Sequence, residues 1–315
     1  MSQNASGGSP WADRSVALLN VAPHFVTQIA QRFRIHRCEE AFDPETEALI
    51  SQFAPVNGAL IAKYPKLRLV ATTMAGYDAI DTKALQERGI LLSTRQSIPD
   101  PCVSDLALGL LIAALRRIPA AERFTRNGNW PGGRFTMTRR VSGRRMGIYG
   151  MGRIGKGIAQ RAAAFDMEIG YHNRTAKADS PYRYFPTLLE MAEWCDYLVV
   201  ACPLSEATRH KVDGKVIAAV GPEGCIVNIA RGPIIDEPAL VEALEKGLLG
   251  SAGLDVFEDE PRVPERLFAL DNVVLTPHQG GVTPENHRDA IATAIDNVET
   301  FFRTGRPLIA INLDE

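Results

Sequence analysis

Three residues able to bind an anion, move a proton and orient a proton carrier follow three apolar runs late in the chain. Arg231 follows "CIVNIA", Glu260 lies shortly after "SAGLDVF", and His278 follows "NVVLTP". Arginine binds carboxylates through two parallel hydrogen bonds, and histidine carries protons near neutral pH. Each residue also has an ordinary structural interpretation, as a helix cap or ion pair, a loop charge, and a turn histidine. Ligands bind at the carboxyl ends of strands in a doubly wound sheet, so the three together predict a catalytic site.

A glycine-rich turn upstream predicts what else binds at that edge. The stretch "YGMGRIG" places Gly150, Gly152 and Gly155 in the pattern G-x-G-x-x-G, between an apolar run and a helix-like run. In a dinucleotide site the first glycine permits a tight turn, the second admits the pyrophosphate, and the third lets helix and strand pack closely. The helix that begins near Arg153 would offer free N–H groups to the phosphates. This setting favours dinucleotide binding over a plain strand–helix turn.

The end of the next strand predicts which dinucleotide binds. An NAD-selective site typically carries Asp or Glu there, about twenty residues further on, to bind the ribose hydroxyls. The stretch "YHNRT" contains neither acid. Arg174 could instead pair with a 2′-phosphate, and Asn173 and Thr175 could add hydrogen bonds. The alternative is that Arg174 is an ordinary solvated arginine. The sequence therefore favours NADP(H) as the preferred cofactor and leaves NAD(H) open as a second one.

Short apolar runs alternate with helix-like stretches along nearly the whole chain, which favours an α/β fold with parallel sheets. The first part predicts one long helix over 104–127, preceded by strands at 15–20, 33–38, 58–62, 67–73 and 89–93. The second part predicts a doubly wound nucleotide-binding sheet with strands at 146–150, 168–173, 197–202, 225–230, 251–257 and 272–277.

A last helix is predicted from Pro284 to about Phe302, and the tail after it, "PLIAIN", is expected to return to the first domain. The substrate domain would then comprise residues 1–103 plus 284–315, with a dinucleotide-binding domain of residues 104–283 inserted between them. The alternative is one large sheet with an appended tail. Residues 1–13, rich in Ser, Asn and Gly, are expected to be disordered.

Composition argues against several classes of function. The 315 residues include 35 Lys+Arg and 37 Asp+Glu, so neither nucleic acid nor a membrane is an expected partner. We expect no transmembrane segment and no signal peptide, because no apolar run is long enough and the N-terminal stretch is polar. Five cysteines without a C-x-x-C pair predict no metal site, no disulfide framework and a reduced, cytoplasmic location.

Five stretches in order resemble the D-isomer-specific 2-hydroxyacid dehydrogenases. They are "GMGRIG", "CPLSEATRH", "NIARGPIIDEPALVEALEKG", "GLDVFEDEP" and "TPHQGG". Within that family, "HNRT" is similar to the NADP-preferring glyoxylate and hydroxypyruvate reductases, including plant hydroxyphenylpyruvate reductases. The resemblance implies a Rossmann domain inserted into a flavodoxin-like substrate domain, and a homodimer joined through the nucleotide-binding domains. It also implies reduction of a small 2-oxo acid, such as glyoxylate or hydroxypyruvate, to the D-2-hydroxy acid.

The resemblance assigns roles to the three strand-end residues. His278 would donate a proton to the substrate carbonyl oxygen as hydride arrives from the nicotinamide. Glu260 would hydrogen-bond the other ring nitrogen, orienting His278 and raising its pKa toward the working pH. Arg231 would bind the substrate carboxylate and polarise the carbonyl.

The stretch "TTMAGYDAID" resembles the family's substrate loop. Backbone N–H groups near Ala75 and Gly76 would bind the substrate carboxylate, with Met74 as a wall of the pocket. The alternative is a tight turn before a helix, and Asp78 and Asp81 are expected to hold that turn or cap the helix.

The cofactor-binding set implied by the resemblance is larger. Asp255 would bind the nicotinamide carboxamide. Cys202, Pro203 and Thr208 would lie near the adenosine, and Ile229 and Ala230 near the nicotinamide ribose. The remaining expected cofactor contacts are Ile154, His278 and Gly280.

Two other classes of function remain open on the sequence. One is a nucleotide-sensing, corepressor-like protein of the same fold, although the missing acid in "YHNRT" argues against an NAD(H) sensor. The other is a dehydrogenase of a different anion, such as phosphite or formate, that uses the same dinucleotide site. Assays of 2-oxo acids, phosphite and formate with both cofactors distinguish these classes.

Overall fold

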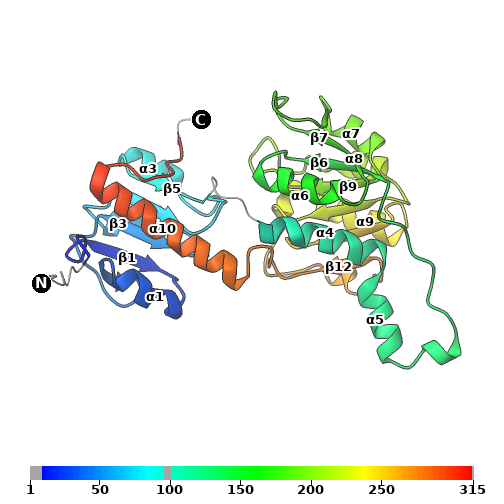
Figure 1. Ribbon diagram of the computed structural model, residues 1–315, viewed down its shortest axis with the longest axis horizontal. Helices are drawn as coiled ribbons and strands as arrows, with labels where there is room; N and C mark the ends of the chain where they lie inside the picture. Colours follow the sequence, from blue (N-terminus) through cyan, green and yellow to red (C-terminus); the bar gives the residue numbers. More distant parts are fainter. Residues whose placement is uncertain (1–8, 96–100, 314–315) are drawn as a thin grey trace, which may run out of the picture. The chain divides into compact units, whose positions relative to one another are not determined.

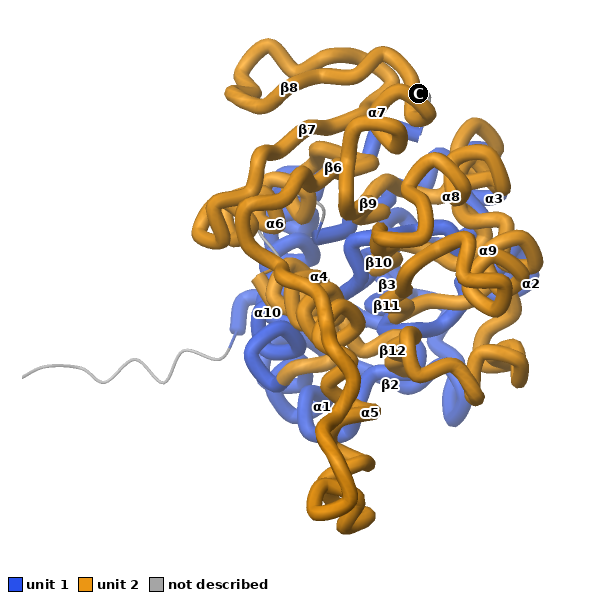
Figure 2. Tube along the Cα trace, turned by 90° about the vertical axis from the view of Figure 1, so that its right-hand side faces the viewer, with its two compact units in different colours: residues 1–98, 284–315 blue, residues 99–283 orange. Residues whose placement is uncertain are grey.

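The computed structural model describes residues 9–95 and 101–313 and divides the chain into two compact units (Figure 2). Unit 1 consists of Met1–Ile98 and Pro284–Glu315, and unit 2 of Pro99–Thr283. Each unit is built on one parallel sheet with helices (Figure 1), so the predicted α/β fold with two parallel sheets is confirmed.

Unit 1 contains a five-stranded parallel sheet in the order β2-β1-β3-β4-β5. This is the flavodoxin-like order, in which the first strand lies between the second and third. The strands are β1 (Ser15–Leu19), β2 (Arg34–Arg37), β3 (Ala48–Ser51), β4 (Leu69–Thr72) and β5 (Leu91–Ser93). The central strands β3 and β4 are buried throughout, as parallel strands covered on both faces must be.

Helices cover both faces of this sheet. Val16 and Leu18 pack into a core with α1 and α10, whereas Ala17, between them, packs into the core on the opposite face with α2 and α3. This alternation follows from the two-residue period of a strand. The helices are α1 (Pro23–Ala30), α2 (Gly58–Lys63), α3 (Thr82–Glu87) and α10 (Pro284–Thr304).

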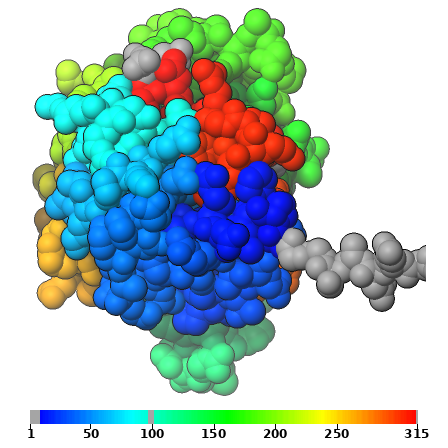
Figure 3. Space-filling model, turned by 90° about the vertical axis from the view of Figure 1, so that its left-hand side faces the viewer, coloured from blue at the N-terminus to red at the C-terminus, as the bar shows by residue number. Residues whose placement is uncertain are grey.

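The C-terminal tail returns to unit 1, as predicted. Ile311 N–H donates to Leu92 O at 2.9 Å, and Ala310 forms an antiparallel bridge with Ser93. Figure 3 shows the last segments of the chain, in red, beside the first ones, in blue, on the surface of unit 1.

Two expectations for unit 1 are wrong. The apolar run at 58–62 forms helix α2, because the Asn57 side chain accepts the Leu60 N–H at 2.9 Å and caps a helix there. The sheet uses "ALIS", β3, instead. Residues 9–13, expected to be disordered, form a turn in which Trp11 packs on Phe302 with ring centroids 5.9 Å apart. Residues 1–8 lie outside the described residues.

Unit 2 contains a seven-stranded parallel sheet in the order β12-β11-β10-β9-β6-β7-β8. Six of these strands were predicted, and the two-residue β8 was not. The strands are β6 (Arg145–Tyr149), β7 (Glu168–His172), β8 (Arg183–Tyr184), β9 (Tyr197–Val200), β10 (Cys225–Asn228), β11 (Ser251–Leu254) and β12 (Val273–Leu275). The strand order reverses between β6 and β9, which makes the carboxyl ends of these two strands the topological switch point where ligands bind.

Helices α4 and α6 share one core of unit 2, and α7, α8 and α9 share the other. The helices are α4 (Pro101–Leu115), α5 (Ile118–Arg126), α6 (Arg153–Ala163), α7 (Leu188–Trp194), α8 (Gly214–Val220) and α9 (Glu237–Glu245). Short 3₁₀ helices lie at η1 (Trp130–Gly132), η2 (Gly232–Ile234) and η3 (Glu265–Leu267). None of the described helices is both long and apolar enough to cross a membrane.

The single helix expected over 104–127 is two helices, α4 and α5. Arg117 takes a left-handed conformation, with φ 48°, and Pro119 occupies the first turn of α5. Proline cannot continue a preceding helix, so the chain turns before it. The sequence-based domain boundary between residues 103 and 104 also falls inside α4, whose residues all belong to unit 2. Helix α5 and the segment after it extend away from the rest of unit 2 (Figure 1).

Candidate active site

The glycine turn joins β6 to α6 at the switch point. Gly150 has φ +107°, and a Cβ there would overlap the backbone of Cys202, which follows β9. A Cβ on Gly155 would overlap the Gly150 carbonyl oxygen, so helix and turn touch through backbone alone. Gly152 is the N-cap of α6, and a Cβ on it would meet no described atom within 4 Å. The turn therefore has the tight backbone and the open approach to free N–H groups that fit a pyrophosphate.

The predicted selectivity residues follow β7 directly. Asn173 Oδ1 accepts the Met151 N–H at 2.7 Å, which ties the end of β7 to the glycine turn. This structural role was not foreseen from the sequence. Arg174 and Thr175 are exposed, and Arg174 forms no hydrogen bond or ion pair with any residue that the structure describes. Its guanidinium is therefore not engaged by the described part of the chain.

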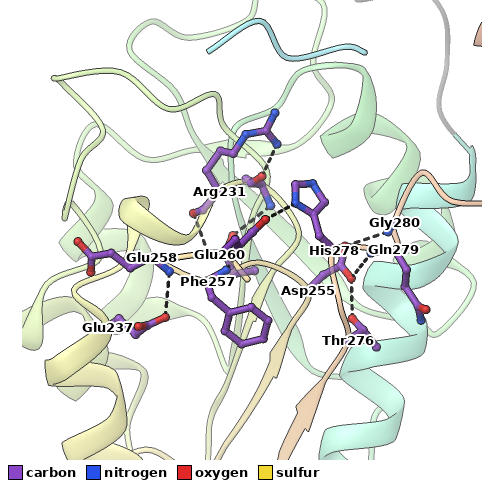
Figure 4. Close-up of polar contacts among 12 residues, drawn as sticks. Arg231, Glu237, Asp255, Phe257, Glu258, Glu260, Thr276, His278, Gln279 and Gly280 are labelled. Atoms are coloured by element: carbon purple, nitrogen blue, oxygen red, sulfur yellow. Dashed lines mark hydrogen bonds and ion pairs between the residues drawn. The ribbon is translucent and has the colours of Figure 1, made fainter. Parts of the chain in front are cut away.

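Glu260 and His278 are in direct contact, although 18 residues separate them in the chain. His278 Nδ1 lies 2.7 Å from Glu260 Oε2, and Glu260 Oε1 accepts the Phe257 N–H at 3.1 Å (Figure 4). The backbone bond orients the carboxylate, and the carboxylate orients the imidazole with Nδ1–H as donor. About a third of each side chain is exposed. His278 Nε2 has no partner among the described residues.

Asp255, at the end of β11, organises the loop that carries His278. Its side chain is buried, with 1% exposed. Oδ1 accepts the Thr276 hydroxyl at 2.6 Å and the Gln279 N–H at 2.8 Å, and Oδ2 accepts the Gly280 N–H at 2.9 Å (Figure 4). The Asp255 carbonyl also accepts the His278 N–H at 2.8 Å. These bonds hold His278 at φ 49°, a conformation that a non-glycine residue adopts only when its surroundings impose it.

The Arg231 segment is fixed by its own hydrogen bonds and by close contact with the loop that carries Glu260. Asn228 Nδ2 donates to the Arg231 carbonyl at 3.0 Å, and Arg231 Nη1 donates to the Ala230 carbonyl at 2.7 Å. A Cβ on Gly232 would overlap the backbone of Phe257, so the segment after Arg231 rests directly on that loop. Gly232 was not foreseen as a site residue. The only sequence signal is its place between a functional arginine and a proline.

Arg231, Glu260 and His278 come from loops after three neighbouring strands, β10, β11 and β12. Figure 4 shows the Arg231 guanidinium and the His278 ring projecting away from the strands on the same side of the site. A guanidinium and an oriented imidazole thus share one sheet edge with the glycine turn, as their positions after the strands predicted.

The other predicted cofactor residues of unit 2 lie along the same edge. Cys202 is buried, and burial raises the pKa of its thiol to about 12. The Thr208 hydroxyl donates to the Pro203 carbonyl at 2.9 Å, which closes the loop after β9. Ile229 and Ala230 follow β10, and Ile154 lies in the first turn of α6.

Met74, Ala75 and Gly76 lie in unit 1, where they follow β4 and are half-buried. The Met74 N–H donates to the Thr72 hydroxyl at 3.2 Å. Asp81 caps α3 by accepting the Ala84 N–H at 3.0 Å, as expected. The assignment of Met74–Gly76 to the substrate stays a prediction. Within the described residues, no group of three or more His, Cys, Asp or Glu is placed to hold a metal ion.

Comparison with known proteins shows which family the chain belongs to. The family model described as "D-isomer specific 2-hydroxyacid dehydrogenase, NAD binding domain" matches residues 108–280. Glyoxylate/hydroxypyruvate reductase A of Arabidopsis thaliana is 45% identical over 81% of this chain and 82% of its own length. Hydroxyphenylpyruvate reductase of Plectranthus scutellarioides is 44% identical over 81% of this chain and 82% of its own length.

A solved structure is similar over nearly the whole chain. It is the NADPH-dependent glyoxylate/hydroxypyruvate reductase of Sinorhizobium meliloti in complex with NADP and malonate. The TM-score is 0.89 at 33% identity, with 96% of this chain and 98% of the other covered. The protein described here therefore belongs to the D-isomer-specific 2-hydroxyacid dehydrogenases, a family of NAD(P)-dependent oxidoreductases.

Proposed function

We propose that this protein uses NADPH to reduce a small 2-oxo acid, such as glyoxylate or hydroxypyruvate, to the D-2-hydroxy acid. The observation that carries the proposal is the Glu260–His278 pair, held at the same sheet edge as Arg231 and the glycine turn. The reductase names of the similar proteins support this substrate class.

In the proposed reaction Arg231, His278 and Glu260 have separate roles. The Arg231 guanidinium binds the substrate carboxylate and draws electron density from the neighbouring carbonyl. The nicotinamide, when bound, supplies the hydride that the carbonyl carbon accepts. His278 Nε2–H then gives its proton to the carbonyl oxygen, and Glu260 stabilises the imidazolium through Nδ1 before that transfer. In the oxidative direction His278 acts as the base. The backbone at Met74–Gly76 is proposed as a further binding site for the substrate carboxylate.

Arg174 is proposed to bind the 2′-phosphate of NADPH. Its exposed guanidinium follows the strand end where an NAD-selective site would carry an acid, and a charge-assisted bidentate pair with phosphate suits it. Arg174→Ala should weaken binding of NADP⁺ by at least about tenfold while changing NAD⁺ binding little. Calorimetric titration with both nucleotides measures this, and equal losses would return Arg174 to an ordinary surface arginine.

The proposed reaction is tested by a substrate panel. Purified protein is incubated with NADPH or NADH and glyoxylate, hydroxypyruvate and other 2-oxo acids, and the loss of reduced-nicotinamide absorbance is followed. Phosphite and formate are run in parallel with the oxidised cofactors. Turnover of phosphite or formate alone would replace the proposal with oxidation of that anion. Nucleotide binding without turnover of any substrate would favour a sensor.

We also propose that the protein is a homodimer joined through unit 2. The segment after α5 exposes 66% of Trp130 and 96% of Met137, and α5 itself exposes 49% of Ile118. Large apolar side chains gathered on one extended segment are typical of a protein–protein interface. Light scattering coupled to size exclusion measures the mass, and a monomer at micromolar concentration would contradict the proposal.

We place the protein in the cytoplasm, because all five cysteines are free.

A further inference from the structure

We infer that Tyr171, a buried residue of β7 that takes no part in the reaction, positions the loop that carries Arg174 and thereby sets the preference for NADPH over NADH. The inference rests on the proposed function, since it concerns how the 2′-phosphate is bound. The loop in question, residues 173–180, connects the end of β7 to the segment before β8.

The Tyr171 hydroxyl holds this loop by its backbone. It accepts the Lys177 N–H at 2.8 Å and lies 3.4 Å from the Lys177 carbonyl oxygen, to which it donates. A phenolic hydroxyl can do both at once, being both donor and acceptor. Only 1% of Tyr171 is exposed, and its ring packs against Tyr184 with centroids 5.5 Å apart. A buried tyrosine of the core therefore binds the backbone of Lys177 in an exposed loop.

The other attachments of the loop are at its ends. Asn173 is bound to Met151 in the glycine turn, at the start of the loop. Near the other end, Asp179 pairs with Lys156 of α6 at 2.7 Å, and this ion pair lowers the pKa of Asp179. The Lys156 and Asp179 side chains are exposed, and exposed ion pairs contribute little to stability. The Tyr171 hydroxyl is thus the attachment from the core to the middle of the loop.

This attachment matters for one cofactor and not for the other. NADPH carries a 2′-phosphate that Arg174 is proposed to bind, and NADH has a hydroxyl there. If the loop is ordered before NADPH binds, no free energy is lost in ordering it when the phosphate contact forms. A loose loop must be ordered on binding, which reduces affinity. Loosening the loop should therefore weaken NADPH binding selectively. A residue that merely filled the core would affect both cofactors through general loss of structure.

Tyr171→Phe removes the hydroxyl and keeps the ring. The expected result is a Kd for NADP⁺ raised about 3- to 10-fold, the loss expected for one net hydrogen bond, with the Kd for NAD⁺ within about twofold of the wild type. The KM for NADPH should rise in parallel and kcat should stay nearly unchanged. Calorimetry supplies the Kd values independently of turnover.

Tyr197→Phe is the matched control. Tyr197 is also buried in this sheet, with 2% exposed, and its hydroxyl donates to the Arg140 carbonyl at 2.7 Å. It begins β9, at the edge opposite the carboxyl ends, so its loss should leave the ratio of the two Kd values unchanged. A ratio changed equally by Tyr171→Phe and Tyr197→Phe would overturn the inference.

A double-mutant cycle with Arg174→Ala tests whether Tyr171 acts through the loop. In the Arg174→Ala background, Tyr171→Phe should add little further loss of NADP⁺ affinity. If Arg174→Ala leaves the preference for NADP⁺ over NAD⁺ unchanged, Arg174 does not bind the phosphate. The inference is then tested by the effect of Tyr171→Phe alone on the two Kd values. A selective NADP⁺ loss then supports a loop that binds the phosphate through another group, and equal losses for both nucleotides overturn the inference.

A second pair of variants covers the case in which Tyr171→Phe does not fold. Lys177→Pro removes the N–H that Tyr171 accepts, and Lys177→Ala removes the same side chain but keeps the N–H. Lys177→Pro should lower the affinity for NADP⁺ several-fold relative to Lys177→Ala, with no matching change for NAD⁺. Equal affinities of the two variants for NADP⁺ would overturn the inference.

Discussion

At the scale of single residues, Glu260 uses its two carboxylate oxygens for different purposes. One accepts a backbone N–H and fixes the side chain, and the other faces His278 Nδ1. Asp255 uses both of its carboxylate oxygens to hold the loop that carries His278, accepting three hydrogen bonds from it. Two acids thus hold one imidazole, Glu260 through the ring and Asp255 through the backbone. An imidazole fixed in this way loses little freedom when it transfers a proton.

His278→Asn should lower kcat by about 10²-fold or more, because asparagine keeps a polar side chain but has no proton to transfer at neutral pH. The Kd for NADP⁺ should change little. Steady-state kinetics and calorimetry on the same preparation measure the two effects. Unchanged kcat would remove His278 from the proton transfer.

Gly232→Ala should damage both stability and activity. The added Cβ would overlap the Phe257 backbone, so the Arg231 segment and the Glu260 loop must move apart, at a cost of about 1–3 kcal/mol. Thermal unfolding and kcat/KM measure the two losses. Gly109→Ala, in α4, is the control, since its Cβ would meet nothing within 4 Å and alanine favours helix. Equal effects of the two substitutions would show that the close approach at Gly232 is not rigid.

At the scale of elements, the strands and the glycine turn could be predicted because their signals are local. An apolar run such as "YLVV" is buried wherever it lies in a parallel sheet, and the turn is encoded within six residues. The prediction of a strand at 58–62 was wrong because a local run of five apolar residues fits a helix as well as a strand. The side-chain cap at Asn57 starts a helix there. Gly232 and the bonds of Asp255 depend on partners more than twenty residues away, which no local pattern reveals.

The start of α10 should make the stability of unit 1 depend on pH. Burial, followed by the charges of His24 and Arg95, lowers the pKa of His287 below its ordinary 6.5. The unfolded chain therefore binds this proton at a higher pH than the folded chain. The contribution of His287 is present above pH about 6.5 and is lost as the pH falls through that value toward the folded pKa.

Thermal unfolding near pH 7.5 and near pH 5.5 tests this point. The wild type should lose more Tm between the two conditions than His287→Asn, because the variant has no proton to gain there. Parallel losses in the two proteins would assign the pH dependence to other groups.

At the scale of the whole molecule, the chain builds one unit from a continuous stretch and the other from both of its ends. The core between the unit 1 sheet and α10 includes Ile291, Ala294, Ile295, Val298 and Phe301 of that helix. Without residues 284–315, the part of that face not covered by α1 would expose its apolar side chains to water. Unit 2 carries its sheet, its helices and the three strand-end residues within Pro99–Thr283.

The discontinuity of unit 1 has a consequence for the order of events on the ribosome. The strands of unit 1 emerge first, but helix α10, which completes their core, emerges last. Unit 2 should therefore fold before unit 1 does. Limited proteolysis of nascent chains that end at residue 283 would show this as a resistant fragment beginning near Pro101 and a readily cleaved N-terminal part. Protection of both parts at that length would mean that the first hundred residues fold without α10.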